Sequence, residues 1–187
     1  MRKVSAFNSI SLDGYFTDKN SDMSWAHCAP PDEDFDNFVK GNAGGGGTLL
    51  FGRKTFQMME SFWPTDEAKK MMPEIAEGMN RMEKIVFSKT LSEVTWNNSK
   101  IIKGNLIEEV RKLKTQDGID ITILGSGSII AQLSEEGLID DYSVVVIPVV
   151  LGSGRTQFDG LKKKMNLKLT NSRTFKNGNV FLSYSPA

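Results

Sequence analysis

The stretch that decides the fold is residues 121–158, ITILGSGSIIAQLSEEGLIDDYSVVVIPVVLGSGRTQF. Its first four residues form a mostly apolar run, in which three are Ile or Leu, and predict a short buried strand. A Gly-Ser-Gly-Ser turn at 125–128 follows and opens an amphipathic helix with its apolar residues on one side. A second, longer buried strand comes next, and a Gly-Ser-Gly turn closes it. A turn of this kind leaves backbone N–H groups unpaired at a helix start, where the helix dipole favours an anion. The sequence therefore predicts that the pyrophosphate of a dinucleotide binds at 125–128.

Length and charge narrow the classes of protein to which the chain can belong. Its 187 residues are expected to form a single domain over residues 1–187, large enough to bury a core without metals or disulfides. The 23 Lys and Arg side chains balance the 23 Asp and Glu side chains, and no long run of either sign occurs. Surfaces that bind nucleic acid or anionic membranes depend on an excess of basic residues, so neither partner is expected.

The counts of cysteine and histidine and the hydropathy of the chain exclude further classes of protein. Cys28 is the only cysteine, which excludes an intramolecular disulfide and is typical of a reducing compartment. His27 is the only histidine, so neither a metal site nor Cys–His catalysis has the partners that it needs. The longest apolar run, residues 142–151, is too short to span a bilayer, and no signal-peptide region follows the amino terminus. We therefore expect a soluble, cytoplasmic protein.

The rest of the chain alternates strands with helices. Strands are predicted at 4–10, 48–52, 84–87 and 100–103, in addition to those of the central stretch. Helices are predicted after Asp32, from Gly52 through Met59, over 66–81 with an interruption at Pro73, and after Asn105. Residues 16–31 indicate an irregular loop, and residues 166–185 a hairpin with a type I′ turn at Asn177-Gly178. This order predicts an α/β fold: a mixed, mostly parallel sheet flanked by helices, with an antiparallel C-terminal hairpin.

Three turns follow the carboxyl ends of predicted strands, at 52–55, 88–90 and 125–128. In open α/β sheets, ligands collect along this edge. Together the turns supply backbone donors, hydroxyls and the cationic side chains of Arg53, Lys54 and Lys89, which favours NADPH over NADH. Taken singly, each turn is explained equally well as a simple connection between strand and helix. The Rossmann and Walker A motifs are both absent, because neither the third glycine nor a Gly-Lys-Ser/Thr ending occurs.

Asp13 and three aromatic residues are candidates for the substrate side. Asp13 follows the first strand, so its carboxylate is placed to hydrogen-bond an amino-heterocycle and to assist proton transfer. The alternative is that Asp13-Gly14 only makes a turn. Trp25, Phe62 and Trp63 are candidates to stack on a flat ring, with core packing as the alternative for each of them. No metal ligand set is predicted.

Several motifs occur together in a characteristic order. They are SLDGY at 11–15, LFGRKT at 50–55, VFSKTL at 86–91, GSGS at 125–128, GLIDD at 137–141 and PVVLGSG at 148–154. With them the chain resembles the dihydrofolate-reductase-like family that includes the C-terminal reductase domain of bacterial riboflavin biosynthesis. The similarity covers nearly the whole chain and is most specific in the central stretch. No zinc signature of a deaminase domain accompanies it, so the chain resembles a stand-alone member.

The resemblance implies a dihydrofolate-reductase fold, NADPH as hydride donor and a homodimer. It also implies roles for the turns: Gly52, Arg53, Lys54 and Thr55 would hold the adenosine-side phosphates, Ser88 and Lys89 the ribose phosphate, and Gly125, Ser126, Gly127 and Ser128 the pyrophosphate. Asp13 would face the substrate beside the nicotinamide. We therefore expect an NADPH-dependent reductase of a small pyrimidine- or pterin-like compound. The alternative is a non-catalytic nucleotide-binding or sensor module of the same fold.

Overall fold

The computed structural model describes residues 1–187 and is built around an eight-stranded sheet. In spatial order the strands are β5 (Ser99–Ile102), β4 (Glu83–Phe87), β3 (Thr48–Gly52), β6 (Ile121–Leu124), β1 (Val4–Ser11), β7 (Asp141–Ile147), β10 (Val180–Pro186) and β9 (Leu167–Thr174). Neighbouring strands run parallel from β5 to β7, whereas β10 is antiparallel to both β7 and β9. The predicted mostly parallel sheet with an antiparallel C-terminal hairpin is confirmed.

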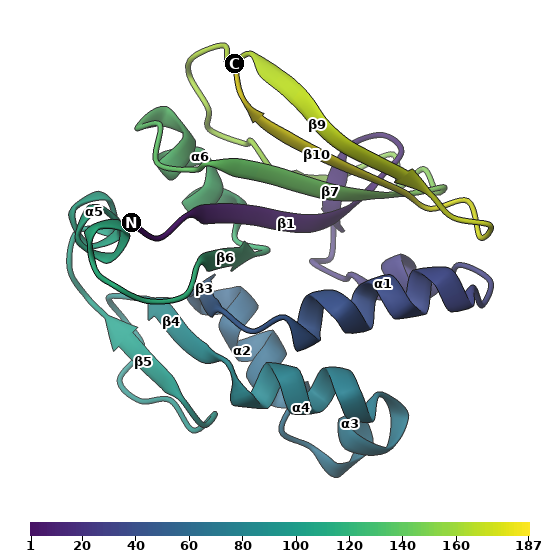
Figure 1. Ribbon diagram of the computed structural model, residues 1–187, viewed down its shortest axis with the longest axis horizontal. Helices are drawn as coiled ribbons and strands as arrows, with labels where there is room; N and C mark the ends of the chain where they lie inside the picture. The colour runs from purple at the N-terminus through teal and green to yellow at the C-terminus, as the bar shows by residue number, and fades with distance from the viewer.

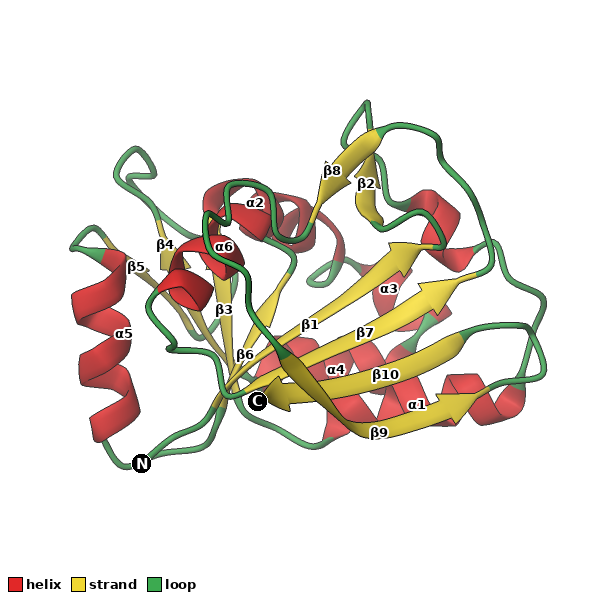
Figure 2. Cartoon of the chain, turned by 90° about the horizontal axis from the view of Figure 1, so that it is seen from above, coloured by secondary structure: helices red, strands yellow, loops and turns green.

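Six α-helices cover the two faces of the sheet. They are α1 (Glu33–Gly44), α2 (Arg53–Phe62), α3 (Asp66–Met71), α4 (Pro73–Arg81), α5 (Leu106–Thr115) and α6 (Gly127–Glu135). The first four lie on one side of the sheet in Figure 1, and α5 and α6 lie on the other; in Figure 2, α6 lies in front of the strands and α5 beside them. None of the helices combines the length and the apolar character that crossing a membrane requires.

Local signals explain where several helices begin. The Asp32 carboxylate accepts the N–H groups of Asp34 and Phe35 and caps α1, as predicted. Asn105 caps α5 in the same way. Pro73 occupies the first turn of α4, where its missing N–H costs nothing, and thereby separates α4 from α3.

The alternation of side chains along the strands produces a core on each face. In β1, Val4 and Ala6 belong to a cluster of 14 buried residues beneath α5 and α6. Phe7 points to the opposite face and packs with the group around Trp25 and Val145. Because both faces are covered, β3 and β6 are largely apolar, as is typical of parallel sheets, whereas half of the residues of β1 are polar.

The segment predicted as an irregular loop contains regular structure. It holds β2 (Tyr15–Asp18) and a 3-10 helix, η1 (Ser24–His27). β2 pairs in antiparallel fashion with β8 (Gly154–Thr156), which begins within a predicted turn. We call β2 and β8 the ribbon; Figure 2 shows it above the carboxyl-terminal half of β1. The prediction was wrong because each short strand depends on a partner that is remote in sequence.

The turn of the C-terminal hairpin also differs from the prediction. The N–H of Gly178 donates to the carbonyl of Phe175, so Lys176 and Asn177 are the central residues of the turn. Gly178 has φ 88°, but Asn177 is not in the left-handed region, which a type I′ turn requires at both central positions. The hairpin itself is confirmed, whereas its turn type was wrong.

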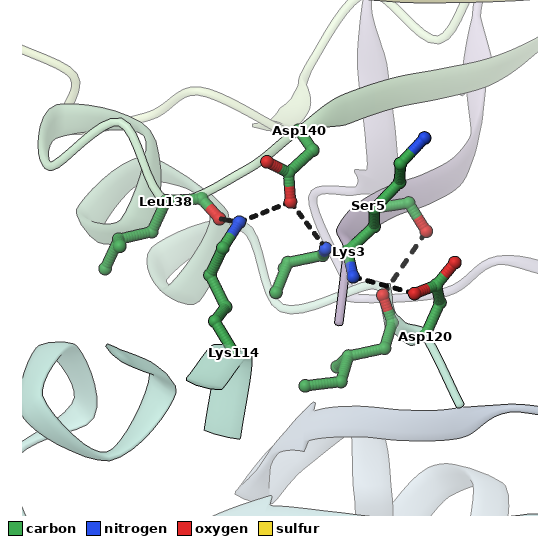
Figure 3. A network of polar contacts seen from close by, with 8 residues as sticks. Lys3, Ser5, Lys114, Asp120, Leu138 and Asp140 are labelled. Atoms are coloured by element: carbon green, nitrogen blue, oxygen red, sulfur yellow. Dashed lines mark hydrogen bonds and ion pairs between the residues drawn. The ribbon is translucent and has the colours of Figure 1, made fainter. Parts of the chain in front are cut away.

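A polar network fixes the start of β1 at the amino-terminal edge of the sheet (Figure 3). Lys114 forms an ion pair with Asp140, and the Asp140 carboxylate accepts the N–H of Val4 at 2.7 Å. Nearby, the Asp120 carboxylate accepts the N–H of Lys3 at 2.7 Å. These contacts set the position of β1 between β6 and β7, and so the position of the site at its other end.

Candidate functional site

The candidate site lies at the carboxyl ends of β4, β3, β6 and β1. β3 and β6 are neighbours, so the helices that follow them, α2 and α6, begin side by side. The first N–H groups of each helix have no intrahelical acceptor and carry the positive end of the helix dipole. The structure thus brings the predicted turns at 52–55 and 125–128 together. We call this edge the rim.

Ser126 joins the two turns directly. Its Oγ accepts the N–H of Gly52 at 2.7 Å and donates to Oγ1 of Thr55 at 3.1 Å. The side chain is buried, and its backbone is left-handed with φ 55°. The Ser126 hydroxyl and the Gly52 N–H are therefore already paired, which leaves the N–H groups of Gly127 and Ser128 as the donors of this turn.

Gly125 and Gly127 are required by close packing at the rim. Gly125 has φ 61°, and a Cβ on it would lie 2.8 Å from Cγ2 of Thr55. A Cβ on Gly127 would lie 2.9 Å from the ring of Phe16 in the ribbon. The N–H of Gly125 donates to Oδ1 of Asn8 at 2.7 Å, so β1 also holds this turn. Glycine at these positions lets the two helix starts and the ribbon approach one another.

The three cationic side chains predicted for the site remain free of carboxylate partners. Arg53, Lys54 and Lys89 are exposed, and none of them is among the ion pairs of the structure. The Arg53 side chain donates one hydrogen bond, to Oε1 of Gln57 at 3.2 Å. Ser88 shapes the turn before Lys89, because its Oγ accepts the N–H of Leu91 at 2.9 Å. Uncompensated positive charge at a rim of helix starts favours a phosphorylated ligand.

Asp13 is exposed at the end of β1, and its carboxylate is already engaged. Oδ1 accepts the hydroxyl of Ser11 at 2.6 Å and the N–H of Leu151 at 3.1 Å, and Oδ2 accepts the N–H of Gly152 at 2.7 Å. The hydrogen bond from Ser11, together with those from Gly152 and Leu151, holds the pKa of Asp13 below its usual value. Asp13 is therefore ionised at neutral pH and ties the segment after β7 to the end of β1.

The predicted aromatic residues do not converge on the rim. Trp25 is buried against Val145 and Ile147 and donates its indole N–H to the carbonyl of Asp22. Phe62 and Trp63 lie at the far end of α2, whose 10 residues span about 15 Å. Their rings pack edge to face against each other, with centroids 5.1 Å apart. Each of the three thus has the packing contacts of a structural aromatic residue.

Two residues without a predicted role also belong to the rim. Asn8 holds the N–H of Gly125, and its own amide N–H donates to Oε1 of Gln157 at 2.7 Å. Both amide side chains are buried. Asn8 is one of four polar residues among the eight of β1, so its place in the sequence did not single it out. No local signal distinguished Gln157, because only the fold places it beside β1.

Comparison with known proteins gives a consistent result. The family model described as the RibD C-terminal domain matches residues 2–181. The uncharacterized protein YyaP of Bacillus subtilis (strain 168) is 34% identical over 183 residues, which cover 98% of this chain and 94% of YyaP. A second B. subtilis protein, the uncharacterized YwjB, is 24% identical over 178 residues, covering 93% of this chain and 92% of its own length.

Solved structures share the same fold. A putative riboflavin biosynthesis protein from Shewanella sp. PV-4 superposes with a TM-score of 0.75 at 24% identity and covers 99% of both chains. A diaminohydroxyphosphoribosylaminopyrimidine deaminase/5-amino-6-(5-phosphoribosylamino)uracil reductase from Thermotoga maritima gives a TM-score of 0.71 at 14% identity. All of this chain matches 57% of that longer protein. From the family match over residues 2–181 and the shared fold, we conclude that the chain belongs to the RibD C-terminal domain family.

Proposed function

We propose that the protein is an NADPH-dependent reductase of a small pyrimidine- or pterin-like compound. One observation carries this proposal: two helix starts, joined by Ser126, lie side by side at a rim with three unpaired cationic side chains. Family membership supports the same assignment, because the family is related to a reductase domain of riboflavin biosynthesis.

The rim suits a dinucleotide with an additional phosphate. The N–H groups of Gly127 and Ser128, with those of the first turn of α2, would bind the pyrophosphate. Lys89, which follows β4, lies two strands away from β6 and would meet the phosphate on the adenosine ribose. Arg53 and Lys54 lie between these positions, at the start of α2. The nicotinamide would supply the hydride, while the protein orients the two reactants and excludes water.

Asp13 would act on the substrate as a hydrogen-bond acceptor. A carboxylate has about four acceptor positions, and the chain itself fills three of those on Asp13. The remaining one is available to an amino group of a heterocycle. Because the pKa of Asp13 is lowered, this residue is a poor proton donor at neutral pH, and we assign proton delivery to solvent.

Asp13→Asn tests this role. The asparagine amide has one oxygen in place of two, so it cannot accept hydrogen bonds from the chain and from the substrate together. We therefore expect KM for the substrate to rise about tenfold, the equivalent of one charge-assisted hydrogen bond. Affinity for NADPH alone should stay within a factor of two or so of the wild-type value. An unchanged KM would remove Asp13 from the substrate site.

A second candidate is a nucleotide-binding module without turnover. It is favoured by the chemistry of Asp13, which is ionised and whose hydrogen bonds stabilise a loop. Steady-state oxidation of NADPH against a panel of pterins and aminopyrimidines separates the two candidates. Binding of NADPH without oxidation across the panel would favour the module.

Calorimetry with NADPH and NADH tests the cofactor assignment. Loss of one charge-assisted contact to phosphate in Lys89→Ala should lower NADPH affinity about tenfold and leave NADH affinity unchanged. Lys168→Ala, which removes an exposed lysine from the edge strand β9, is the matched control. Equal affinities of the wild type for NADPH and NADH would contradict the assignment. We also propose the homodimer that the resemblance implies; a molar mass near 20.8 kDa by light scattering would refute it.

A further inference from the structure

A chain of buried amides runs from the start of α6 to the end of the ribbon. The N–H of Gly125 donates to Oδ1 of Asn8, and Nδ2 of Asn8 donates to Oε1 of Gln157, each at 2.7 Å. Asn8 is 4% exposed and Gln157 is 3% exposed. At the end of this chain, Nε2 of Gln157 is buried and has no hydrogen-bond partner.

The direction of the hydrogen bonds in this chain is fixed. A backbone N–H can only donate, so the oxygen of the Asn8 amide must face Gly125. The NH2 group of Asn8 then faces Gln157, which must present its own oxygen to it. The NH2 group of Gln157 is therefore the free end. The chain delivers a hydrogen-bond donor, and only a donor, to this position.

The unpaired donor lies where the ribbon meets the start of α6. Gln157 directly follows β8, and the carbonyl of Thr156 would lie 3.2 Å from a Cβ on Gly127. The ribbon itself pairs irregularly, with a register shift between Tyr15 and Thr17. Oγ1 of Thr17 is also buried without a partner. These unpaired buried polar groups destabilise the packing of the ribbon on the start of α6. A ligand group that enters between the ribbon and α6 can therefore displace this packing at little cost in free energy.

We propose that Gln157, oriented by Asn8, donates a hydrogen bond to an oxygen on the nicotinamide half of the bound dinucleotide. This inference rests on the proposed function. The order of the strands selects that half: Lys89 follows β4, the helix starts follow β3 and β6, and Asn8 belongs to β1, the next strand along. A dinucleotide whose ribose phosphate is at β4 and whose pyrophosphate is at β3 and β6 places its nicotinamide half at β1. The donor is uncharged, which suits a carboxamide or hydroxyl oxygen.

The test compares three probes with four proteins. NADPH, reduced nicotinamide mononucleotide and adenosine 2′,5′-bisphosphate are titrated by calorimetry into the wild type, Gln157→Glu, Gln157→Met and Gln132→Glu. Gln157→Glu retains an oxygen for Asn8 and replaces the free donor with an acceptor. Gln157→Met is a second variant of similar volume without added charge. Gln132→Glu makes the same change of charge on the exposed face of α6.

We expect both Gln157 variants to bind NADPH and the mononucleotide about tenfold more weakly, and the bisphosphate unchanged, because one hydrogen bond is lost from one half of the ligand. Gln132→Glu should bind all three probes as the wild type does. Unchanged affinities in the Gln157 variants overturn the contact. An equal loss for all three probes also overturns it, since it shows that the turn has been distorted. Failure of the wild type to bind any probe refutes the proposed function itself.

Discussion

Replacing Ser126 with alanine tests whether one hydroxyl joins the two helix starts. In the wild type, this hydroxyl accepts the N–H of Gly52 at 2.7 Å and donates to Thr55 at 3.1 Å. Alanine adopts the same left-handed backbone at a cost similar to that of serine. The change in stability therefore reports the lost hydroxyl and not a change of backbone conformation.

The expected loss of stability depends on the Gly52 N–H, which the substitution leaves without its acceptor. A hydrogen bond contributes about 0.5–1.5 kcal/mol net, and a buried donor without a partner costs about 1–3 kcal/mol. Gly52 is only partly buried, so water can reach its N–H after the substitution. We expect the free energy of unfolding to fall by about 1–2 kcal/mol, within the lower part of that range. For a chain of this size this corresponds to a decrease in Tm of about 2–8 °C.

Urea denaturation followed by tryptophan fluorescence measures the effect. Ser128→Ala is the matched control, because it removes an exposed hydroxyl from the same turn, and a change below about 0.5 kcal/mol is expected there. A double-mutant cycle of Ser126→Ala with Thr55→Ala should show a coupling of about 0.5–1 kcal/mol. Equal stabilities of the two serine variants, or strict additivity in the cycle, would refute the reasoning.

Three further changes test other parts of the structure. Gly125→Ala forces a Cβ to within 2.8 Å of Thr55 at a backbone φ of 61°. We therefore expect the free energy of unfolding, measured by urea denaturation, to fall by more than about 2 kcal/mol. A fall of less than about 1 kcal/mol would show that the turn relaxes. Lys114→Met leaves the Asp140 carboxylate without its cation and should destabilise the chain by about 1–2 kcal/mol; an unchanged urea midpoint would contradict the role assigned to this pair. Burial alone would raise the pKa of Glu60, but hydrogen bonds from the segment at 95–96 outweigh burial and lower this pKa. The ionised carboxylate therefore stabilises the fold at neutral pH, and this stabilisation is lost as pH falls below about 4.3. Glu60→Gln should therefore lose less stability than the wild type between about pH 5 and 3, and parallel pH profiles would argue against this linkage.

Much of the candidate site was predictable because its turns follow apolar strands. The turns at 52–55, 88–90 and 125–128 each come after a short apolar run, and parallel strands bring their carboxyl ends to one edge. The cations Arg53, Lys54 and Lys89 of these turns are exposed. Whether they bind a phosphorylated nicotinamide dinucleotide stays a prediction for the experiments above.

The three aromatic candidates do not lie at the rim. Phe62 and Trp63 are near the turn at 52–55 in sequence, but α2 carries them away from the rim. Trp25 is buried beneath the sheet by contacts with β7. Closeness in sequence predicts closeness in space only over a few residues of a helix or strand. The direction of α2, and with it the position of its far end, was decided by the packing of α2 on β3 and β4.

The sequence by itself determined the strands of the eight-stranded sheet and the helices that cover it. Apolar runs specified these strands, Asp32 and Asn105 specified the starts of α1 and α5, and Pro73 specified the break between α3 and α4. Only the tertiary structure decided the hydrogen bonds that hold the turns of the rim together. Ser126 bonds to a residue 74 positions earlier, and Gly125 to one 117 positions earlier. The ribbon likewise pairs two short strands from opposite ends of the chain. Caps and apolar runs act over a few neighbouring residues and leave a local pattern, whereas these contacts form only after the sheet has placed its strands side by side.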